Sequence, residues 1–245
     1  MVQRFGGVAL VALGLVTGCT VSLPVGGEVP NGKEAQLSFD VDGAVAAGSP
    51  FKVKVWAPTV TDRCYGMLGC SSRAPMMSAI LGCTDEAQCV QTDKEPNETE
   101  DNECTFIMMA GQPGTTEIIA EVTTADGEVR RDRITVNVVA ATDVLVDCPR
   151  CNDGSLEPGE EAELSCHPMN LAVQDFPLRG DCEVLTGGAG VVTRPAGVDA
   201  EFNITTDRGV AANNFMLRLE DREGGDVTFR SGSVERTMHA QAGMR

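Results

Sequence analysis

The sequence predicts an all-β protein of two consecutive β-sandwich domains cross-linked by disulfides. Three observations support this prediction. Apolar and polar residues alternate in several short segments, as expected for strands with one buried face. A pattern of glycines and apolar residues that begins at Asp42 recurs at Asp153. Finally, the chain has ten cysteines and only 4% aromatic residues, and disulfides commonly compensate for a thin core in exported proteins.

Alternation in the first half predicts strands and one hairpin. Asp126-Gly127 lies between two alternating segments, and this dipeptide favours a tight hairpin turn. The apolar phase shifts between Val129 and Ile134, which predicts a β-bulge in the second strand of that hairpin. The alternating segments are residues 35–41, 51–55, 118–122 and 134–138.

Two stretches of the first half do not alternate. Residues 74–81 (A-P-M-M-S-A-I-L) are expected to form a short helix whose methionines pack against the core. Residues 93–103 combine acidic side chains with a proline and no apolar residue. We interpret this run as a solvated loop, with calcium capture as the alternative.

The second half repeats the scheme of the first. Residues 153–166 align without a gap on residues 42–55, an offset of 111 positions (153 minus 42), with the pattern D-G-x-[V/L]-x-x-G. Two later apolar segments, 215–219 and 227–229, flank Gly224-Gly225 and are interpreted as the counterpart of the first hairpin. These repeats predict a domain at residues 34–140, with a cysteine-rich insertion, and a second domain at residues 141–245.

This order of elements resembles the immunoglobulin-like β-sandwiches of bacterial surface proteins, in which D-G-x-L-x-P-G-E precedes a core strand. The fold class expected from the resemblance is therefore two tandem immunoglobulin-like domains. The sequence departs from true immunoglobulin domains, which have a Cys…Trp…Cys set on their central strands. Trp56 only ends the strand at 51–55, and Cys166 lies on the expected strand while residues 214–221 contain no cysteine.

The N-terminus has the features of a secretory signal. Residues 5–16 follow Arg4 and contain no charged or amide side chain, which fits a signal-peptide apolar region. A helix that spans a bilayer needs about 20 apolar residues, so this run is too short to remain as a span.

Leu15-Val16-Thr17-Gly18-Cys19 resembles the lipobox of bacterial lipoproteins. The resemblance implies that residues 1–18 are a cleaved signal peptide and that Cys19 is acylated, for example with palmitate. Residues 19–33 would then form a lipidated N-terminus and a flexible tether rich in Gly and Pro. Thr20 after the cysteine favours the outer membrane, on either its periplasmic face or the cell surface. An ordinary cleaved signal with a chance cysteine is the alternative.

The remaining nine cysteines are interpreted as disulfide residues. Because nine is odd, one of them must be free, paired between molecules or bonded across the two halves, which hold five and four cysteines. The spacing C-x5-C occurs twice and suggests two small loops, but the sequence leaves the connectivity open. The candidates are Cys64, Cys70, Cys83, Cys89, Cys104, Cys148, Cys151, Cys166 and Cys182.

Cys148-Pro149-Arg150-Cys151 resembles the glutaredoxin motif C-P-Y-C, but the residues after it cannot form the helix that activates that motif. A zinc site is the second alternative for this region, with ligands from Cys148, Cys151, Cys166, His167 and Cys182. Weak calcium binding by Asp153 and Glu160 is a third, although the EF-hand pattern is incomplete.

The formal net charge of −17 argues against nucleic acid and against docking on anionic lipid. No motif of a serine hydrolase or a metalloprotease is present. We therefore expect a membrane-anchored, non-catalytic module for binding, adhesion or assembly, without a cofactor. Its partner would be an envelope protein or a surface polymer. The alternative is an envelope redox or metal-binding protein that uses Cys148, Cys151, Cys166 and Cys182.

Overall fold

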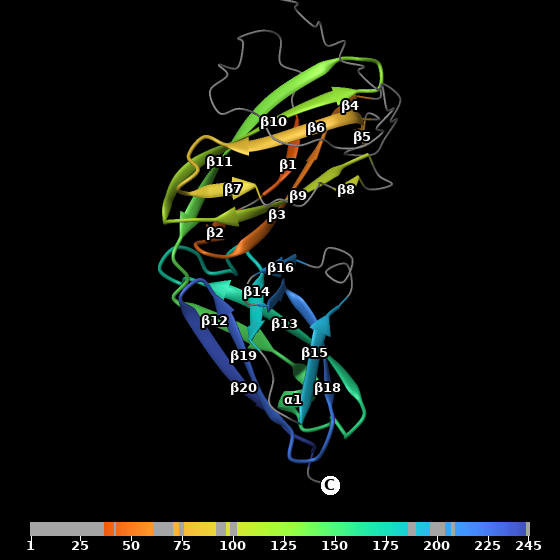
Figure 1. Cartoon of the computed structure of the whole chain (residues 1–245), viewed down its shortest axis with the longest axis vertical. Helices are drawn as coiled ribbons and strands as arrows, with labels where there is room; N and C mark the ends of the chain where they lie inside the picture. Colours follow the sequence, from red (N-terminus) through yellow and green to blue (C-terminus); the bar gives the residue numbers. More distant parts are fainter. Residues whose placement is uncertain are drawn as a thin grey trace, which may run out of the picture.

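The computed structural model describes residues 37–41, 43–60, 71–73, 76–91, 97–98, 102–185, 190–196, 204–206 and 209–243. These residues form strands and one four-residue helix, so the all-β prediction is confirmed. The signal peptide, Cys19, the tether, Cys64, Cys70 and most of the acidic run 93–103 lie outside the described residues. Figure 1 shows two β-sandwiches stacked end to end, with the C-terminus at the far end of the second.

The first sandwich, called module 1, packs two sheets face to face. One sheet has the order β1-β3-β9-β7, with β8 also paired to β9, and the other has the order β2-β11-β10-β6. A separate two-stranded ribbon joins β4 to β5. The strands are β1 Ser38–Asp40, β2 Ala44–Ala46, β3 Pro50–Trp56, β4 Pro58–Val60, β5 Ser71–Arg73, β6 Met76–Cys83, β7 Cys89–Gln91, β8 Asn97–Glu98, β9 Cys104–Ala110, β10 Gly114–Thr124 and β11 Val129–Val139.

The second sandwich, called module 2, repeats this plan. Its sheets have the orders β12-β13-β18-β15 and β16-β17-β14-β19-β20. The elements are β12 Asp143–Asp147, α1 Pro149–Asn152, β13 Glu161–Met169, β14 Cys182–Leu185, β15 Val191–Pro195, β16 Ile204–Thr206, β17 Gly209–Ala212, β18 Asn214–Leu219, β19 Gly225–Ser231 and β20 Val234–Ala240.

Both modules have the strand order of an immunoglobulin-like sandwich. In that fold the first, second, fifth and fourth main strands form one sheet and the third, sixth and seventh form the other. Module 1 matches with β1-β3-β9-β7 and β6-β10-β11, and module 2 matches with β12-β13-β18-β15 and β14-β19-β20. The prediction of two tandem immunoglobulin-like sandwiches is therefore confirmed.

The gap-free repeat seen in the sequence is also a structural repeat. Gly48 and Gly159, which the alignment pairs, have φ angles of 74° and 86°, a left-handed conformation that favours glycine. Two positions later, β3 starts at residue 50 and β13 at residue 161. Val45 and Leu156, also paired by the alignment, are both 0% exposed. The sequence pattern therefore encodes the same tight turn before the second main strand of each module.

Each module has its own apolar core. The core of module 1 contains Phe51 and Phe106, and that of module 2 contains Phe215 and Phe229. The latter two rings come from opposite sheets and lie 5.6 Å apart between centroids. A tilted pair at this distance favours a defined packing across the sandwich.

The helix expected at residues 74–81 is wrong, because Met76–Cys83 forms strand β6. From Ala79 onward alternate residues are buried, and the strand pairs antiparallel with β10 over seven residue pairs. The register shifts between Thr123 and Thr124, opposite Met77. This irregularity interrupts the alternation near Met77 and hides the strand pattern in the sequence.

The bulge expected between Val129 and Ile134 is also wrong. β10 and β11 pair without a register shift from Gly114–Val138 to Thr123–Val129. Arg130 instead occupies an inward position at the end of the sheet, where its guanidinium donates to the Pro58 carbonyl at 2.7 Å. The shift in apolar phase therefore marks an inward-facing, partly buried arginine and not an extra residue.

The hairpin at Asp126-Gly127 forms as predicted. Gly127 has φ 85°, and the Asp126 carboxylate accepts hydrogen bonds from the Thr124 hydroxyl and the Glu128 N–H. These hydrogen bonds hold the pKa of the Asp126 carboxyl below its usual value. The turn is therefore fixed by both a glycine conformation and a side-chain acceptor.

The hairpin expected from residues 215–219 and 227–229 is wrong in its pairing. β18 and β19 belong to different sheets, and the terminal hairpin of module 2 pairs β19 with β20. Both segments are strands, as expected, but the chain crosses the sandwich between them. β18 is instead the counterpart of β9, the fifth main strand of module 1.

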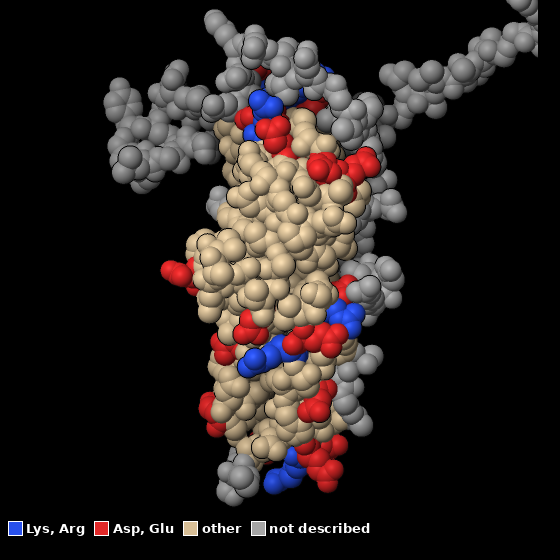
Figure 2. All heavy atoms as spheres, turned by 90° about the vertical axis from the view of Figure 1, so that its left-hand side faces the viewer, with Lys and Arg blue, Asp and Glu red and all other residues tan. Residues whose placement is uncertain are grey.

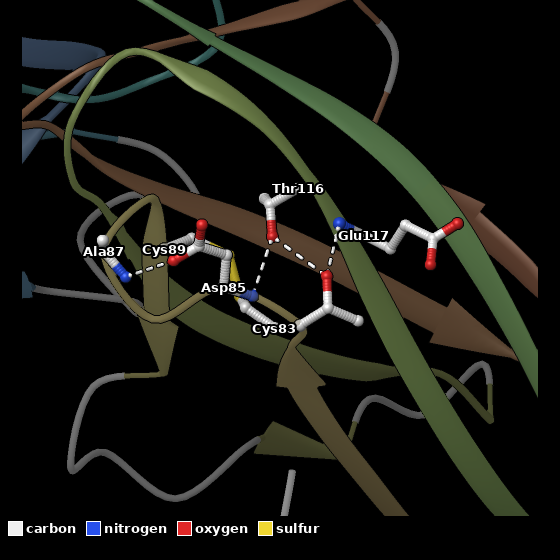
Figure 3. The surroundings of a disulfide bond; sticks show 7 residues. Cys83, Asp85, Ala87, Cys89, Thr116 and Glu117 are labelled. Carbon is white, nitrogen blue, oxygen red and sulfur yellow. Dashed lines mark hydrogen bonds between the residues drawn. A yellow bond between two sulfur atoms is a disulfide. The ribbon is translucent and has the colours of Figure 1, made fainter. Parts of the chain in front are cut away.

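Disulfides join the two sheets within each module. Cys83–Cys89 connects β6 to β7, and Cys166–Cys182 connects β13 to β14. Figure 3 shows the Cys83–Cys89 bond beside a network in which the Thr116 hydroxyl accepts the Asp85 N–H and lies 3.4 Å from the Thr84 hydroxyl. The expectation that the cysteines form disulfides is confirmed for these bonds.

Candidate functional site

The clearest candidate surface is an exposed apolar loop between β13 and β14. This junction loop, residues 170–177, lies at the left of Figure 1 where the two modules meet. Its three large apolar side chains, Leu171, Val173 and Phe176, are 70%, 51% and 57% exposed. They account for three of the eight exposed large apolar side chains among the described residues. Clustered exposed apolar groups of this kind mark interaction surfaces.

Polar side chains at its base hold the junction loop in one conformation. Asn170 is 8% exposed; its amide donates to the Ala140 carbonyl at 2.8 Å and its side-chain oxygen accepts the Ala172 N–H at 3.1 Å. Gln174 donates to the Pro177 carbonyl at 2.8 Å and accepts from the Ala44 N–H of module 1 at 3.3 Å. The apolar side chains are therefore presented on a preordered backbone, which lowers the entropic cost of binding.

The segment after the loop joins the two modules by backbone pairing. The Ala46 N–H donates to the Arg179 carbonyl at 2.7 Å, and the Arg179 N–H donates to the Ala44 carbonyl at 2.8 Å. The Asp181 N–H donates to the Pro50 carbonyl at 2.7 Å. These bonds connect segments about 130 residues apart in sequence and restrict relative movement of the modules at the loop.

Apolar and hydroxyl contacts complete the junction. Leu178, 2% exposed, packs in one cluster with Ala44, Ala46 and Ala141. The hydroxyls of Ser49 and Ser231 form a buried hydrogen bond of 2.7 Å across the modules. Two close turns meet here as well: a Cβ placed on Gly232 would lie 2.4 Å from the Ala47 carbonyl oxygen. Only glycine fits this approach.

Charges are unevenly distributed around the junction. Figure 2, which views the left side of Figure 1, shows a broad area without Lys, Arg, Asp or Glu over module 1, while the junction loop itself carries the exposed Asp175. Charged side chains border this area, and at the junction Arg179 pairs with Asp40 at 2.9 Å. A neutral surface is notable on a chain with a net charge of −17, because it is where another acidic molecule can approach with least repulsion.

The cysteines considered for a redox or zinc site form two separate disulfides. Cys148 bonds to Cys151, and Cys166 bonds to Cys182, so none of the four is a thiolate ligand in this structure. Cys148 is the N-cap of α1, and Cys151 lies within this single turn, which ends at Asn152. Cys148 is 1% exposed, whereas the attacking cysteine of a redox C-x-x-C motif is accessible.

Cys104 is also disulfide-bonded. Its partner lies outside the described residues, because the other described cysteines pair among themselves. Cys104 is 0% exposed on β9.

The possible calcium ligands Asp153 and Glu160 are engaged by donors from the chain. The Asp153 carboxylate accepts the Ser155 N–H at 2.9 Å, and hydrogen bonding by Ser155 holds the pKa of Asp153 below its usual value. Glu160 pairs with Arg150 at 2.6 Å. Across the described part of the chain, no group of three or more His, Cys, Asp or Glu side chains is arranged to hold a metal ion. Both carboxylates have structural partners in their turns.

The histidines lie in two different settings. His239 on β20 contacts Asp226 on β19, with 2.7 Å between Nδ1 and Oδ1, as a directly opposed cross-strand pair. The neighbouring outward pair on these strands, Thr228 and Thr237, shares a hydroxyl hydrogen bond of 2.8 Å. His167 lies on β13 and is half-buried. The His239 pair belongs to a polar ladder that stabilises the outer face of the hairpin.

The junction loop was not identified from the sequence. Its apolar residues do not alternate and belong to no known motif, so neither period-two nor helical analysis detects them. The sequence does contain one signal, the apolar residues Leu171, Val173 and Phe176. They lie between Pro177 and the end of a strand near Met169. Three large apolar residues in a non-alternating connection predict either a loop buried in the core or an exposed contact surface. The structure shows that these three side chains are exposed.

Comparisons with known proteins assign no family to this chain. No family model matches the chain, and no curated protein matches it. Similar solved structures include domains 5–6 of the S-layer protein SbsC, with 14% identity and a TM-score of 0.37, covering 85% of this chain and 96% of that chain. The D0–D1 domain of intimin has 13% identity, a TM-score of 0.28 and coverages of 85% and 98%. Fibronectin(III)-like modules of Clostridium thermocellum CbhA have 11% identity, a TM-score of 0.26 and coverages of 85% and 94%. Similarity at this level does not define a function.

Within the described residues, no helix is long and apolar enough to cross a bilayer.

Proposed function

We propose that this chain is an exported lipoprotein whose two sandwich modules bind a partner through the junction loop without catalysing a reaction. In this proposal residues 1–18 are removed, Cys19 is acylated, and the modules project from the outer membrane on the tether of residues 19–33. The partner is an envelope protein or a surface polymer. The role is adhesion or assembly.

The observation that carries the binding role is the preordered apolar loop. Leu171, Val173 and Phe176 are exposed, yet their backbone is fixed by Asn170 and Gln174 and by the paired junction. Burying a Leu, Val or Phe side chain contributes about 1.5–3 kcal/mol. While these three side chains are exposed to water, the isolated chain gains no stabilisation from their burial. Burial against a partner recovers that free energy.

Two further observations support export. Disulfides persist in oxidising compartments and are rare in the cytosol, and the described residues contain the bonds Cys83–Cys89, Cys148–Cys151 and Cys166–Cys182. The lipobox-like segment that ends at Cys19 provides the anchor. More than one acyl chain is enough for stable membrane attachment.

The partner is tested by cross-linking in intact cells, followed by purification of the full chain and identification of bound molecules. The test variant replaces Leu171, Val173 and Phe176 with serine. The control variant replaces Leu145 and Val192, which are 48% and 47% exposed on module 2, with serine. We expect one discrete partner with the wild type and the control, and at least a tenfold loss with the loop variant.

Equal recovery from all three proteins would contradict the role of the loop, and failure to enrich any partner with folded wild-type protein would contradict the binding function. The anchor is tested separately with Cys19→Ala. We expect this variant to lose membrane fractionation, whereas the loop variant retains it. A Cys19→Ala protein that still fractionates with membranes would contradict lipid anchoring but leave the loop assignment standing.

A further inference from the structure

Strand β6 is an unusual edge strand. It spans Met76–Cys83 and pairs on one side with β10. Among the described residues no strand pairs with its other side. Its sequence, M-M-S-A-I-L-G-C, contains no charged residue and no proline. A strand edge without a partner strand is a template for pairing with another chain.

The other described edge strands carry the features that discourage such pairing. β12 and β20 contain charged residues, and β15 contains an arginine and a proline. The remaining edge strands, among them β1, β2, β7 and β16, have at most three residues. Charges, prolines and short length are the usual protection of edges. β6 lacks all three.

Module 2 shows what covers the equivalent edge. β14, the counterpart of β6, pairs on one side with β19 and on the other with β17, an uncharged strand of sequence G-V-A-A. β17 belongs to the connection between β15 and β18. In module 1 the same connection, between β7 and β9, is the acidic run of residues 93–103. Its described part, β8, pairs with β9 and not with β6.

The edge is also rigid. β6 holds its register with β10 from Ser78 to Cys83. Immediately beyond, the Cys83–Cys89 bond and the hydrogen bonds of Thr84 and Asp85 to the β10 residues Thr116 and Glu117 fix the end of the strand, as Figure 3 shows. A strand held in its extended form loses little entropy when a second strand pairs with it.

We propose that β6 pairs antiparallel with β6 of a second copy of this chain. In a two-fold contact each residue near the axis meets its own copy, so a charged edge would repel itself, whereas β6 is neutral. Centring the pair on Ile80 places Ile80 opposite Ile80 and Ser78 opposite Gly82, with the outward faces of both strands aligned. This pairing is β-strand addition in trans.

Neighbouring charges on the same face do not oppose the contact. Glu121, directly opposite Ile80 on β10, forms an ion pair with Arg131 of β11. Glu117 pairs with Arg133 at 3.2 Å. The outer face beside the edge is therefore neutralised within each copy. A protein with a net charge of −17 can bring two copies together here with little repulsion.

The test is site-specific photo-cross-linking of the full chain in intact cells, with benzoylphenylalanine in place of Met77, which is 50% exposed. Two copies with different tags are expressed together. We expect an adduct of twice the chain mass that carries both tags. An adduct with a different protein, or no adduct from protein that retains its disulfides, would overturn the proposal.

A matched pair of variants locates the contact. Ile80→Lys adds a charge to the edge, whereas Ile119→Lys adds one to β10, one strand inward on the same face; both isoleucines are half-buried. We expect Ile80→Lys to lower the adduct yield at least tenfold and Ile119→Lys to change it less than twofold. Ser78→Lys is a second edge variant, so the conclusion does not depend on whether the Ile80→Lys protein folds. Adducts that persist in both edge variants would refute pairing through β6. The junction loop is unchanged in these variants, so this outcome is independent of the proposed function.

Discussion

Replacing Gly232 with alanine should loosen the junction between the modules while each module stays folded. Gly232 lies in the turn between β19 and β20 with φ 59°. A Cβ at this position would lie 2.4 Å from the Ala47 carbonyl oxygen of module 1. Because the obstructing atom belongs to the backbone, a side-chain rotation cannot relieve the clash, and the two turns must move apart.

The expected magnitude follows from a matched control. Gly127→Ala has a similar backbone cost, since Gly127 has φ 85°, but a Cβ there meets nothing within 4 Å. A left-handed alanine costs about 1–2 kcal/mol. Gly232→Ala also disturbs the Ser49–Ser231 hydrogen bond and the adjacent backbone pairing, and each such bond contributes about 1 kcal/mol. The junction should therefore lose about 2 kcal/mol more than the control.

Residue-resolved hydrogen exchange measures this loss directly. The reporters are the N–H groups of Ala46, Arg179 and Asp181, which donate across the junction. A loss of about 2 kcal/mol corresponds to exchange roughly 30-fold faster. We expect this acceleration in Gly232→Ala and none in Gly127→Ala, with core amides of both modules unchanged. Equal protection of the three reporters in both variants would refute the conclusion that close turn packing holds the modules together.

Further predictions concern stability within the modules. Replacing Cys166 and Cys182 together with serine should lower the free energy of unfolding by about 3 kcal/mol, because the bond closes a loop of 16 residues; denaturant unfolding measures this, and a loss under 1 kcal/mol would contradict it. Arg130→Ala should cost about 2 kcal/mol, since this arginine is 14% exposed and donates to a backbone carbonyl of β4. Arg133→Ala, which removes a 58% exposed side chain, should lower the free energy of unfolding by less than about 0.5 kcal/mol. Similar losses for the two arginines would show that the inward position of Arg130 does not contribute to stability. The pKa of Asp126 is lowered by the hydroxyl of the threonine two residues earlier, so its stabilisation of the hairpin should be present above the unfolded pKa and disappear as the pH falls through the folded pKa. Carboxyl titration by NMR checks this, and a pKa at or above the ordinary value would disprove it.

The sequence predicts those features of the fold that are local. The glycine pattern repeated at Gly48 and Gly159 identifies the turn before β3 and β13, because a left-handed residue in a tight turn strongly restricts residue type. Alternation identifies β3, β10 and β11 because each has one face in the core. The turn at Asp126-Gly127 follows from residue chemistry alone.

The features that were missed depend on contacts distant in sequence. Residues 76–83 contain good helix formers, and only pairing with β10 makes them a strand. An inward arginine at position 130 is acceptable only because a carbonyl of β4 accepts its hydrogen bond. The pairing of β19 with β20, instead of β18, depends on where the chain crosses between sheets, which alternation does not encode.

The candidate binding surface also depends on contacts between residues that are distant in sequence. Leu171, Val173 and Phe176 form a surface only because Asn170 and Gln174 find partners in other segments, including Ala44 of module 1. The sequence does provide the setting for this surface: the lipobox-like segment and the cysteines together predict an exported, cross-linked chain. It does not show which loop meets the partner.

The role of the junction loop is tested most directly by photo-cross-linking from within it. Benzoylphenylalanine replaces Phe176, which is 57% exposed, in the full chain in intact cells, and Leu145, which is 48% exposed on module 2, serves as the control position. If the loop is the binding surface, position 176 should give one discrete adduct that position 145 does not give. The same adducts from both positions, or none from position 176 in folded protein, would contradict the assignment of this loop as the binding surface.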